Sequence, residues 1–372
     1  MTELQPLPFT ASLGEYLVQA ESLLADLRDG DETAAWRFRW EHPRFRDSRI
    51  DEVRSADLDL GDAKLVSARG YAFESWNDLA SFTEAVGRDR GILRFETAAD
   101  AVVYGDRDVL ESLLREDPAL AAAHSARRHR ATLLHYVAAN GVEGWRQRTP
   151  PNAVEIARLL LDAGADPNAL ADMYDERCTT LGMLVSSSPP ADAGVQRPLA
   201  ELLLERGASL DAPGSKWNGA VLTALTFGFL GTARALASSA DPVRDIAVAA
   251  GLGLLGDTAR LLPSAEPERR QVALALACAH GHGPVAQLLL DAGVDPNQYN
   301  PDGFHSHSTP LHQAVWANHE AVARLLVERG ARLDVRDLIY GGTALDWAEH
   351  GGRTGIAEYL RSRPQPPAAA MS

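Results

Sequence analysis

The fold of this chain is decided by a short phrase that recurs with small changes. It reads RLLLDAGADPNA at residues 158–169, ELLLERGASLDA at 201–212, QLLLDAGVDPNQ at 287–298 and RLLVERGARLDV at 324–335. In each copy the leucines predict the apolar stripe of a helix, and the glycine supplies the left-handed residue that ends it. The Asp, Pro or Asn residues after the glycine predict a turn toward the next unit.

A second motif, which begins with threonine, lies upstream of three of these phrases and recurs near the C-terminus. It reads TLLHYVAANG from residue 132, TTLGMLVSSS from 179, TPLHQAVWAN from 309 and TALDWAEHGG from 343. Units of roughly 33 residues with a TPLH-like start and a Gly-Ala end resemble ankyrin repeats. Weaker copies begin at residues 97, 222, 245 and 271, which gives about eight units between Phe95 and Arg363. The resemblance implies an all-α solenoid, because no single unit can bury its apolar face and neighbours must stack.

The N-terminal part of the chain, residues 1–92, shows no such period and is predicted to be a separate helical region. Its string LVSARGYAFESWNDL, residues 65–79, resembles a small helical region found ahead of ankyrin repeats in many bacterial proteins. The resemblance implies that Phe73 and Trp76 pack on the first repeat and cap the open end of the solenoid. The repeats are expected over 93–363, followed by a disordered tail at 364–372 that is poor in core residues.

Two repeats carry insertions between their helices, near residues 142–152 and 187–198. Insertions in repeat proteins fall on the loops of one face, which is often the binding face. Tolerated growth of a surface loop is the alternative, since longer loops cost little free energy. Arg146 and Arg148 in the first insertion are expected either to be solvated or to pair with an acidic group.

Composition narrows the classes of partner. The 372-residue chain is 45% hydrophobic and carries a formal net charge of −15. That charge argues against general binding to nucleic acid or to an anionic membrane, which requires an excess of Lys and Arg. Neither a secretory signal nor a membrane-spanning stretch is visible in the sequence. The two cysteines, Cys178 and Cys278, lie far apart, which fits reduced thiols better than a disulfide framework. A cytoplasmic location is therefore predicted.

Residues 300–320, NPDGFHSHSTPLHQAVWANHE, place four histidines close together. In the ankyrin pattern the TPLH histidine ties its loop to neighbouring backbone, and His135 and His312 hold that position. His305 and His307 would face the same side of an extended segment, and a metal site there would need a third ligand. Recognition of a partner or ligand by these two imidazoles is favoured over metal binding, and no cofactor is predicted.

Ankyrin solenoids bind through a concave side made of hairpin tips and the last turn of each first helix. Counting from the threonine of each motif assigns apolar residues to this side between Phe229 and Trp316, and such a surface indicates an interaction site. If the weak copies at 222 and 245 are irregular, these residues would instead belong to the core. The predicted partner-binding residues are Phe229, Leu230, Leu254, His280, His305, His307, Trp316, Tyr340, His350, Trp217, Tyr174 and Trp145.

These observations predict a scaffold or adaptor that binds a partner protein or peptide in the concave groove. No GxSxG, phosphate-loop or HExxH motif is present, which argues against the common enzyme classes. The alternative is an enzyme, or a small-ligand or metal-binding protein, that uses His280, His305, His307, Trp316 and His350. Imidazoles one repeat apart, at about 10 Å, seldom reach hydrogen-bond distance, which weighs against catalysis. Binding of a neighbour through residues 1–90 is a third hypothesis.

Overall fold

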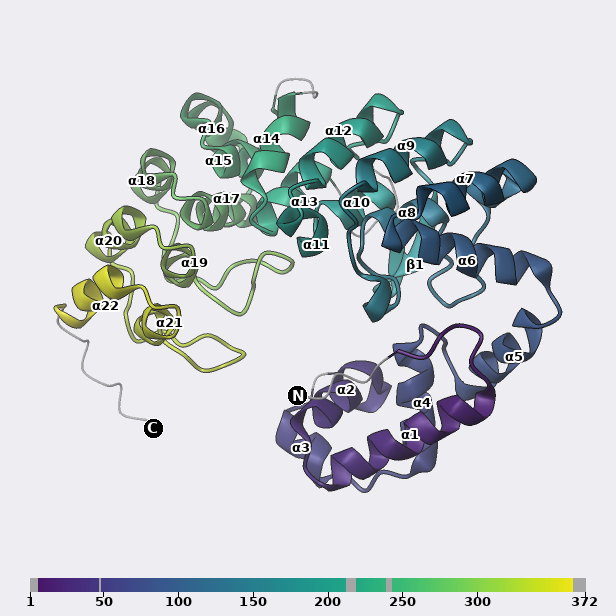
Figure 1. The fold of residues 1–372 in the computed structure, drawn as a ribbon. Helices are drawn as coiled ribbons and strands as arrows, with labels where there is room; N and C mark the ends of the chain where they lie inside the picture. The colour runs from purple at the N-terminus through teal and green to yellow at the C-terminus, as the bar shows by residue number, and fades with distance from the viewer. Residues whose placement is uncertain (1–5, 47, 212–218, 239–242, 364–372) are drawn as a thin grey trace. The chain divides into compact units, whose positions relative to one another are not determined.

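The computed structural model describes residues 6–46, 48–211, 219–238 and 243–363, which form short helices joined by turns (Figure 1). The chain divides into two compact units, Met1–Asn218 (unit 1) and Gly219–Ser372 (unit 2). The predicted all-α repeat architecture is confirmed. None of the described helices is both long and apolar enough to cross a membrane. The predicted disordered tail at 364–372 and the predicted role of Trp217 fall outside the described residues.

The N-terminal part of unit 1 is a cluster of helices with a core of its own, in which Leu23, Phe38 and Val66 are fully buried. The first helix begins at a capping box, where Ser12 and Glu15 exchange hydrogen bonds with the backbone. The elements of this cluster are α1 (Leu13–Arg28), α2 (Glu32–Glu41), η1 (Pro43–Phe45), α3 (Ile50–Ser55), α4 (Leu60–Gly70) and α5 (Trp76–Val86).

Three helix pairs follow in the described part of unit 1. The first helices of the pairs, α6, α8 and α10, pack on one another, and the second helices, α7, α9 and α12, form another layer (Figure 1). Strands β1 and β2 pair antiparallel, with Leu170 opposite Thr179. The elements are α6 (Arg90–Tyr104), α7 (Arg107–Glu116), η2 (Pro118–Ala122), α8 (Leu133–Val137), η3 (Gly144–Arg146), α9 (Ala153–Asp162), β1 (Leu170–Met173), β2 (Glu176–Thr179), α10 (Thr180–Leu184), α11 (Ser188–Asp192) and α12 (Gln196–Glu205).

Unit 2 contains five more helix pairs in its described residues. Their first helices are α13, α15, α17, α19 and α21, and each packs on the next. The elements are α13 (Ala220–Thr226), α14 (Leu230–Ser238), α15 (Ile246–Leu252), α16 (Leu255–Leu261), η4 (Leu262–Ser264), α17 (Pro267–Ala279), α18 (Gly283–Asp291), α19 (Pro310–Trp316), α20 (Glu320–Glu328), α21 (Ala344–His350) and α22 (Thr354–Arg361).

Alanines set the spacing between the first helices of unit 2. Ala250, Ala277, Ala314 and Ala348, on α15, α17, α19 and α21, are all fully buried in one core. Such small side chains let neighbouring helix axes approach closely, since interaxial distance depends on the side chains at the contact. Leu289 of α18 joins the same core from the second layer. Each repeat therefore completes the apolar interior of its neighbour.

The TPLH histidines tie successive repeats together, as the sequence predicts. The His135 Nδ1 accepts a hydrogen bond from the Thr132 hydroxyl (2.9 Å), and its Nε2–H donates to the Cys178 carbonyl in the next repeat (3.2 Å). His312 makes the same pair of bonds, with the threonine of its own motif and with the carbonyl of Gly342 (3.3 Å). Both imidazoles are therefore structural.

Candidate functional site

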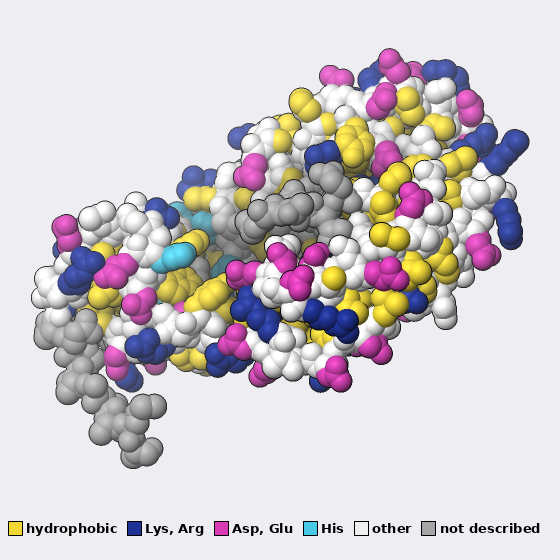
Figure 2. Space-filling view, turned by 60° about the horizontal axis from the view of Figure 1, so that its bottom comes forward, with side chains coloured by type: hydrophobic (Ala, Val, Ile, Leu, Met, Phe, Trp, Pro, Cys, Tyr) yellow, Lys and Arg dark blue, Asp and Glu magenta, His cyan; other side chains and the backbone are white. Residues whose placement is uncertain are grey.

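Unit 2 contains a hollow of about 910 Å³ along its first helices, which we call the C-terminal hollow. Its walls are the C-terminal ends of α13, α17 and α19, one face of α21, and the loops around His305 and Tyr340. Figure 2 shows histidine side chains among hydrophobic ones on this part of the surface, toward the C-terminal end of the chain. Six of the predicted partner-binding residues line the hollow, namely His280, His305, His307, Trp316, Tyr340 and His350.

The hollow forms where the first helices end. A residue with positive φ follows the first helix in each repeat of unit 2, at Gly228, Gly253, Gly281, Asn318 and Gly352. These left-handed residues mark equivalent positions along the array. Phe227 and His280, each directly before its left-handed glycine, both line the hollow. Phe227 is therefore the counterpart of His280, although it was not among the residues predicted from the sequence.

Three of the predicted groove residues do not line the hollow. Phe229 follows the left-handed Gly228, Leu230 begins α14, and Leu254 is the residue before α16. Trp316 lies two residues before its left-handed residue, whereas Phe229 and Leu254 each lie one residue after theirs, so the count along the sequence is three residues late in these repeats. Neither repeat contains the threonine motif from which the count starts. Leu254 is 37% exposed and Phe229 is half-buried, so they are not sealed in the core either.

His280, at the end of α17, reaches past the neighbouring helix α15 to α13. Its Nε2–H donates to the Leu225 carbonyl at 2.8 Å. Gly251 of α15 leaves room between these helices, because a Cβ there would meet Leu225 Cδ1 at 2.8 Å and Leu276 Cβ at 3.3 Å. Burial lowers the pKa of His280 to about 4. The ring is therefore neutral at pH 7, and its Nδ1 is left as a hydrogen-bond acceptor.

The two loop histidines, His305 and His307, do not lie on an extended segment. His305 has a left-handed backbone (φ 60°), and its Nε2–H donates to the carbonyl of Thr226 at 2.9 Å. The two rings are nearly perpendicular, with centroids 6.0 Å apart. Burial lowers the pKa of His307. Among the described residues, no group of three or more His, Cys, Asp or Glu side chains is arranged to hold a metal ion.

Two tryptophans form a corner in the hollow. The rings of Trp316 and Trp347 lie 5.9 Å apart at 74°, and Trp316 is 51% exposed. The Trp347 indole N–H donates to the Asp337 carboxylate at 3.0 Å, which fixes the ring. Trp347 was not among the predicted partner-binding residues. It belongs to the motif TALDWAEHGG and lies one turn before the predicted residue His350, and this spacing in the sequence could have identified it.

Tyr174, another predicted partner-binding residue, lies in unit 1 and takes no part in the hollow. It sits at the tip of the β1–β2 hairpin with a left-handed backbone (φ 54°). Its hydroxyl donates to the Asn140 side chain at 2.6 Å, and the residue is 53% exposed. Tyr174 therefore helps to fix the hairpin against the preceding repeat while part of its ring remains accessible.

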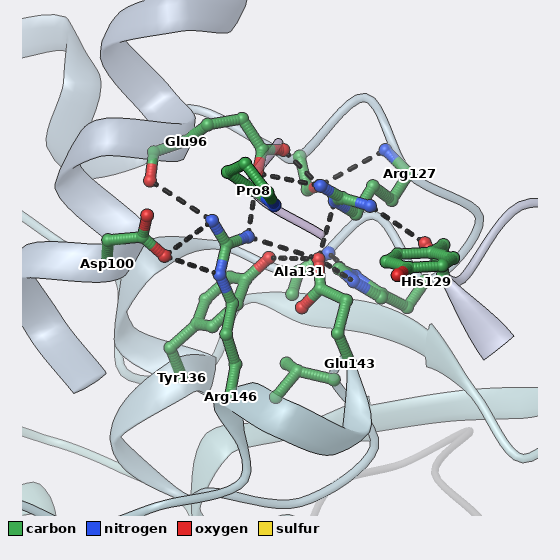
Figure 3. A network of polar contacts seen from close by, with 12 residues as sticks. Pro8, Glu96, Asp100, Arg127, His129, Ala131, Tyr136, Glu143 and Arg146 are labelled. Atoms are coloured by element: carbon green, nitrogen blue, oxygen red, sulfur yellow. Dashed lines mark hydrogen bonds and ion pairs between the residues drawn. The ribbon is translucent and has the colours of Figure 1, made fainter. Parts of the chain in front are cut away.

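Two residues of the first insertion, Glu143 and Arg146, belong to a buried cluster of charged side chains in unit 1 (Figure 3). Arg146 pairs with Glu96 at 2.7 Å, with Asp100 at 2.7 Å and with Glu143 at 3.2 Å. Arg127 pairs with the same two glutamates, at 2.9 Å from Glu96. Both arginines and both glutamates are at most 1% exposed. Arg146 therefore pairs with acidic groups inside the protein, which was one of its two expected states, and it is not solvated.

The insertion and the charged cluster also contact the N-terminal helices. The Trp145 ring lies 4.9 Å from that of Tyr71, and Arg127 donates to the Tyr71 carbonyl at 2.8 Å. The Arg127 guanidinium also lies over the rings of Phe73 and Phe82, at 5.0 and 4.7 Å. Trp145 is thus engaged within unit 1, and we leave it out of the partner-binding set.

The second insertion folds back on its own repeat. Residues 188–192 form the short helix α11, in which Pro190 is buried. The Gln196 side-chain amide donates to the carbonyls of Leu184 (3.1 Å) and Ser187 (3.0 Å), which closes the loop against α10. In both insertions the added residues make internal contacts, so the structure favours a packing role over a free binding lobe.

Comparison with known proteins identifies the repeats. A model of three ankyrin repeats matches residues 246–337 and 276–367, and a single-repeat model matches 129–172. Human cyclin-dependent kinase 4 inhibitor B is 34% identical over 124 residues, which cover 32% of this chain and 85% of the inhibitor. Mouse ankyrin repeat and SAM domain-containing protein 6 is 33% identical over 101 residues, 26% of this chain and 11% of that protein. The solved ankyrin repeat domain of human ASB11 aligns over 73% of this chain and 99% of its own, at 20% identity and a TM-score of 0.39.

Proposed function

Because the chain belongs to the ankyrin-repeat family, we propose that it is a protein-interaction scaffold whose partner binds in the C-terminal hollow. The observation that supports this site is the apolar tip beside the hollow. Leu338, Ile339 and Tyr340 are 66%, 62% and 82% exposed. Contiguous exposed apolar side chains on a folded protein usually mark a surface that another molecule covers. Trp316 extends the same apolar surface into the hollow.

The loop that carries this tip is fixed before any partner arrives. The Asp337 carboxylate accepts hydrogen bonds from the backbone N–H groups of Ile339 (2.9 Å), Tyr340 (2.7 Å) and Gly342 (2.8 Å). It also accepts from the indole of Trp347, so one buried carboxylate joins the loop to α21. A preorganised surface loses little conformational entropy on binding, which favours affinity.

Affinity capture from a lysate of the source cells tests the proposal. A double variant, Trp316→Ala with Tyr340→Ala, removes two exposed aromatic side chains of the hollow and disturbs no buried contact of the core. Trp40→Ala is the matched control, because Trp40 is 67% exposed but lies on α2 in unit 1. We expect the partner to be recovered with the wild type and with the control, and to be lost with the double variant. Equal recovery by all three proteins would rule out the hollow as the recognition surface.

A bacterial and cytoplasmic setting is a separate proposal. It is supported by the resemblance of residues 65–79 to bacterial N-terminal regions and by two buried cysteines, Cys178 and Cys278, instead of a disulfide framework. Fractionation of source cells followed by immunoblotting measures the location. Recovery of the chain in the extracellular fraction would contradict the proposal.

A further inference from the structure

Five hydrogen-bond donors in the walls of the C-terminal hollow are already in use. A backbone carbonyl, a carboxylate or a hydroxyl inside the protein accepts from each of these five, so they are not available to a ligand. They are the hydroxyl of Thr226 (to Leu222 O, 2.9 Å), Nε2–H of His280 (to Leu225 O, 2.8 Å), Nε2–H of His305 (to Thr226 O, 2.9 Å), the amide of Gln313 (to Ser308 Oγ, 2.8 Å) and the indole N–H of Trp347 (to Asp337 Oδ2, 3.0 Å).

The walls also offer acceptors and aromatic faces. The neutral His280 ring keeps an acceptor at Nδ1, and Asp346 contributes a carboxylate whose Oδ2 also caps α21 through Thr343. Among the described residues that line the hollow, none is Lys or Arg, and Asp346 carries the one full charge of fixed sign. The indoles of Trp316 and Trp347 stand nearly perpendicular, so a flat group that stacks on the face of one ring meets the other ring with its edge.

We propose that the C-terminal hollow receives an arginine side chain of the partner protein, with its guanidinium in the Trp316–Trp347 corner and near Asp346. This inference rests on the proposed function. A guanidinium is planar, donates through five N–H groups and accepts none, and stacks on aromatic faces. It therefore matches a surface that has acceptors, indole rings and a carboxylate. A cation above an indole is also stabilised by the ring quadrupole.

The size of the hollow agrees with a peptide segment around that arginine. A volume of about 910 Å³ lies near the upper end of the range of small-ligand sites, roughly 300–1,000 Å³. It exceeds what one side chain fills, so apolar residues beside the arginine have room against Phe227 and Tyr340. A lysine is less suitable, because its ammonium is a compact, strongly hydrated charge that cannot lie flat on an indole.

Titration of the full chain with N-acetyl-argininamide tests the inference without knowledge of the partner. The indole N–H signals of the protein are followed by nuclear magnetic resonance, and those of Trp316 and Trp347 are assigned with single Trp→Phe variants. We expect saturable shifts of both signals. N-acetyl-citrullinamide, which has nearly the same shape but no charge, is expected to bind at least about threefold more weakly, and N-acetyl-lysinamide more weakly than arginine.

Two variants separate the carboxylate from general charge effects. Asp346→Asn keeps an oxygen that can cap Thr343 and removes the charge, so binding of the arginine probe is expected to weaken about threefold. Glu349→Gln is the matched control, since it removes one negative charge from the same helix outside the hollow and should leave the affinity unchanged. Trp316→Leu, at an exposed position that does not support the core, should also weaken binding.

Four results would overturn the inference. They are no binding of the arginine probe, equal binding of the citrulline or lysine probe, equal weakening by Asp346→Asn and Glu349→Gln, and shifts confined to tryptophans other than Trp316 and Trp347. None of these depends on capture of the partner protein. If the arginine probe fails while capture still requires Trp316 and Tyr340, the proposed function stands and only the arginine is excluded. If the probe binds while capture is independent of both residues, the proposed function fails.

Discussion

At the scale of single residues, histidines act in this chain chiefly as ties between repeats. His135, His280, His282, His312 and His319 each donate Nε2–H to a backbone carbonyl of another repeat. Burial disfavours the charged ring, and it lowers the pKa values of His135 and His280 to about 4. These bonds therefore stabilise the fold while the rings stay neutral.

We predict that acidification below about pH 6.5 destabilises the protein. The unfolded chain takes up protons at His135 and His280 near pH 6.5, whereas the folded chain resists until about pH 4. Between these values the free energy of unfolding falls by about 1.4 kcal/mol per pH unit for each ring, and above pH 6.5 the full contribution is present. Urea unfolding across this range measures the slope. The unfolding free energy of His280→Gln should depend less steeply on pH than that of the wild type. His350→Gln, at an exposed position, is the control and should show the same slope as the wild type. An unchanged slope for His280→Gln would contradict the prediction.

How far single residues could be predicted depends on the motif around them. The roles of His135 and His312 followed from the TPLH motif, because motif and hydrogen-bond pattern go together. Phe227 was missed, since its repeat has no such motif and the count began at the wrong residue. The better reference is the left-handed glycine after each first helix, Gly228 in this repeat, because the backbone requires it.

At the scale of elements, α15 has a glycine, Gly251, at the point where it packs between α13 and α17. Gly251 lies opposite the Leu225 side chain, which a Cβ at residue 251 would meet at 2.8 Å. The absence of that Cβ lets α13, α15 and α17 lie close enough for His280 to reach the Leu225 carbonyl. The shape of the hollow at this end therefore depends on one missing methyl group.

We predict that Gly251→Ala destabilises the protein, although alanine favours helix. Overpacking of a tight core costs about 1–3 kcal/mol, which outweighs the gain of about 1 kcal/mol in helix propensity. Gly256→Ala in α16 is the control, because a Cβ there meets nothing within 4 Å, so propensity alone should stabilise that variant. Thermal unfolding of both variants measures the difference. Stabilisation of similar size in both would show that the space around Gly251 is not tight.

The repeat helices were predictable as elements because their apolar periodicity and terminal glycines recur. The loops were not. The segment with His305 and His307 would place both rings on one side only if it were extended, but His305 has a positive φ and its ring bonds to the Thr226 carbonyl. A contact between residues so far apart in the chain leaves no local sequence signal. The same holds for Arg146, whose acidic partner Glu96 lies on α6 in another repeat.

At the scale of the whole chain, the first insertion joins two parts of unit 1 through buried charge. Arg127 and Arg146 meet Glu96 and Glu143 in one cluster, so each buried charge is balanced by opposite ones nearby. Because Arg127 also donates to the Tyr71 carbonyl, the cluster links the N-terminal helices to the first repeats. These contacts support the proposal that residues 1–92 cap the repeat array, which alone would leave an apolar end exposed.

We predict that Arg146→Ala is strongly destabilising and loosens the N-terminal helices. Removal of one partner leaves Glu96 and Glu143 buried with less compensation, which costs about 3–5 kcal/mol. Arg148→Ala is the control, since Arg148 is exposed and its stacking on Tyr104 is worth at most about 1 kcal/mol. Chemical unfolding gives the free energies, and amide hydrogen exchange over residues 60–86 reports on α4 and α5. If Arg146→Ala lowers stability without faster exchange in these helices, the cluster supports the repeats alone and the cap is held by its apolar contacts.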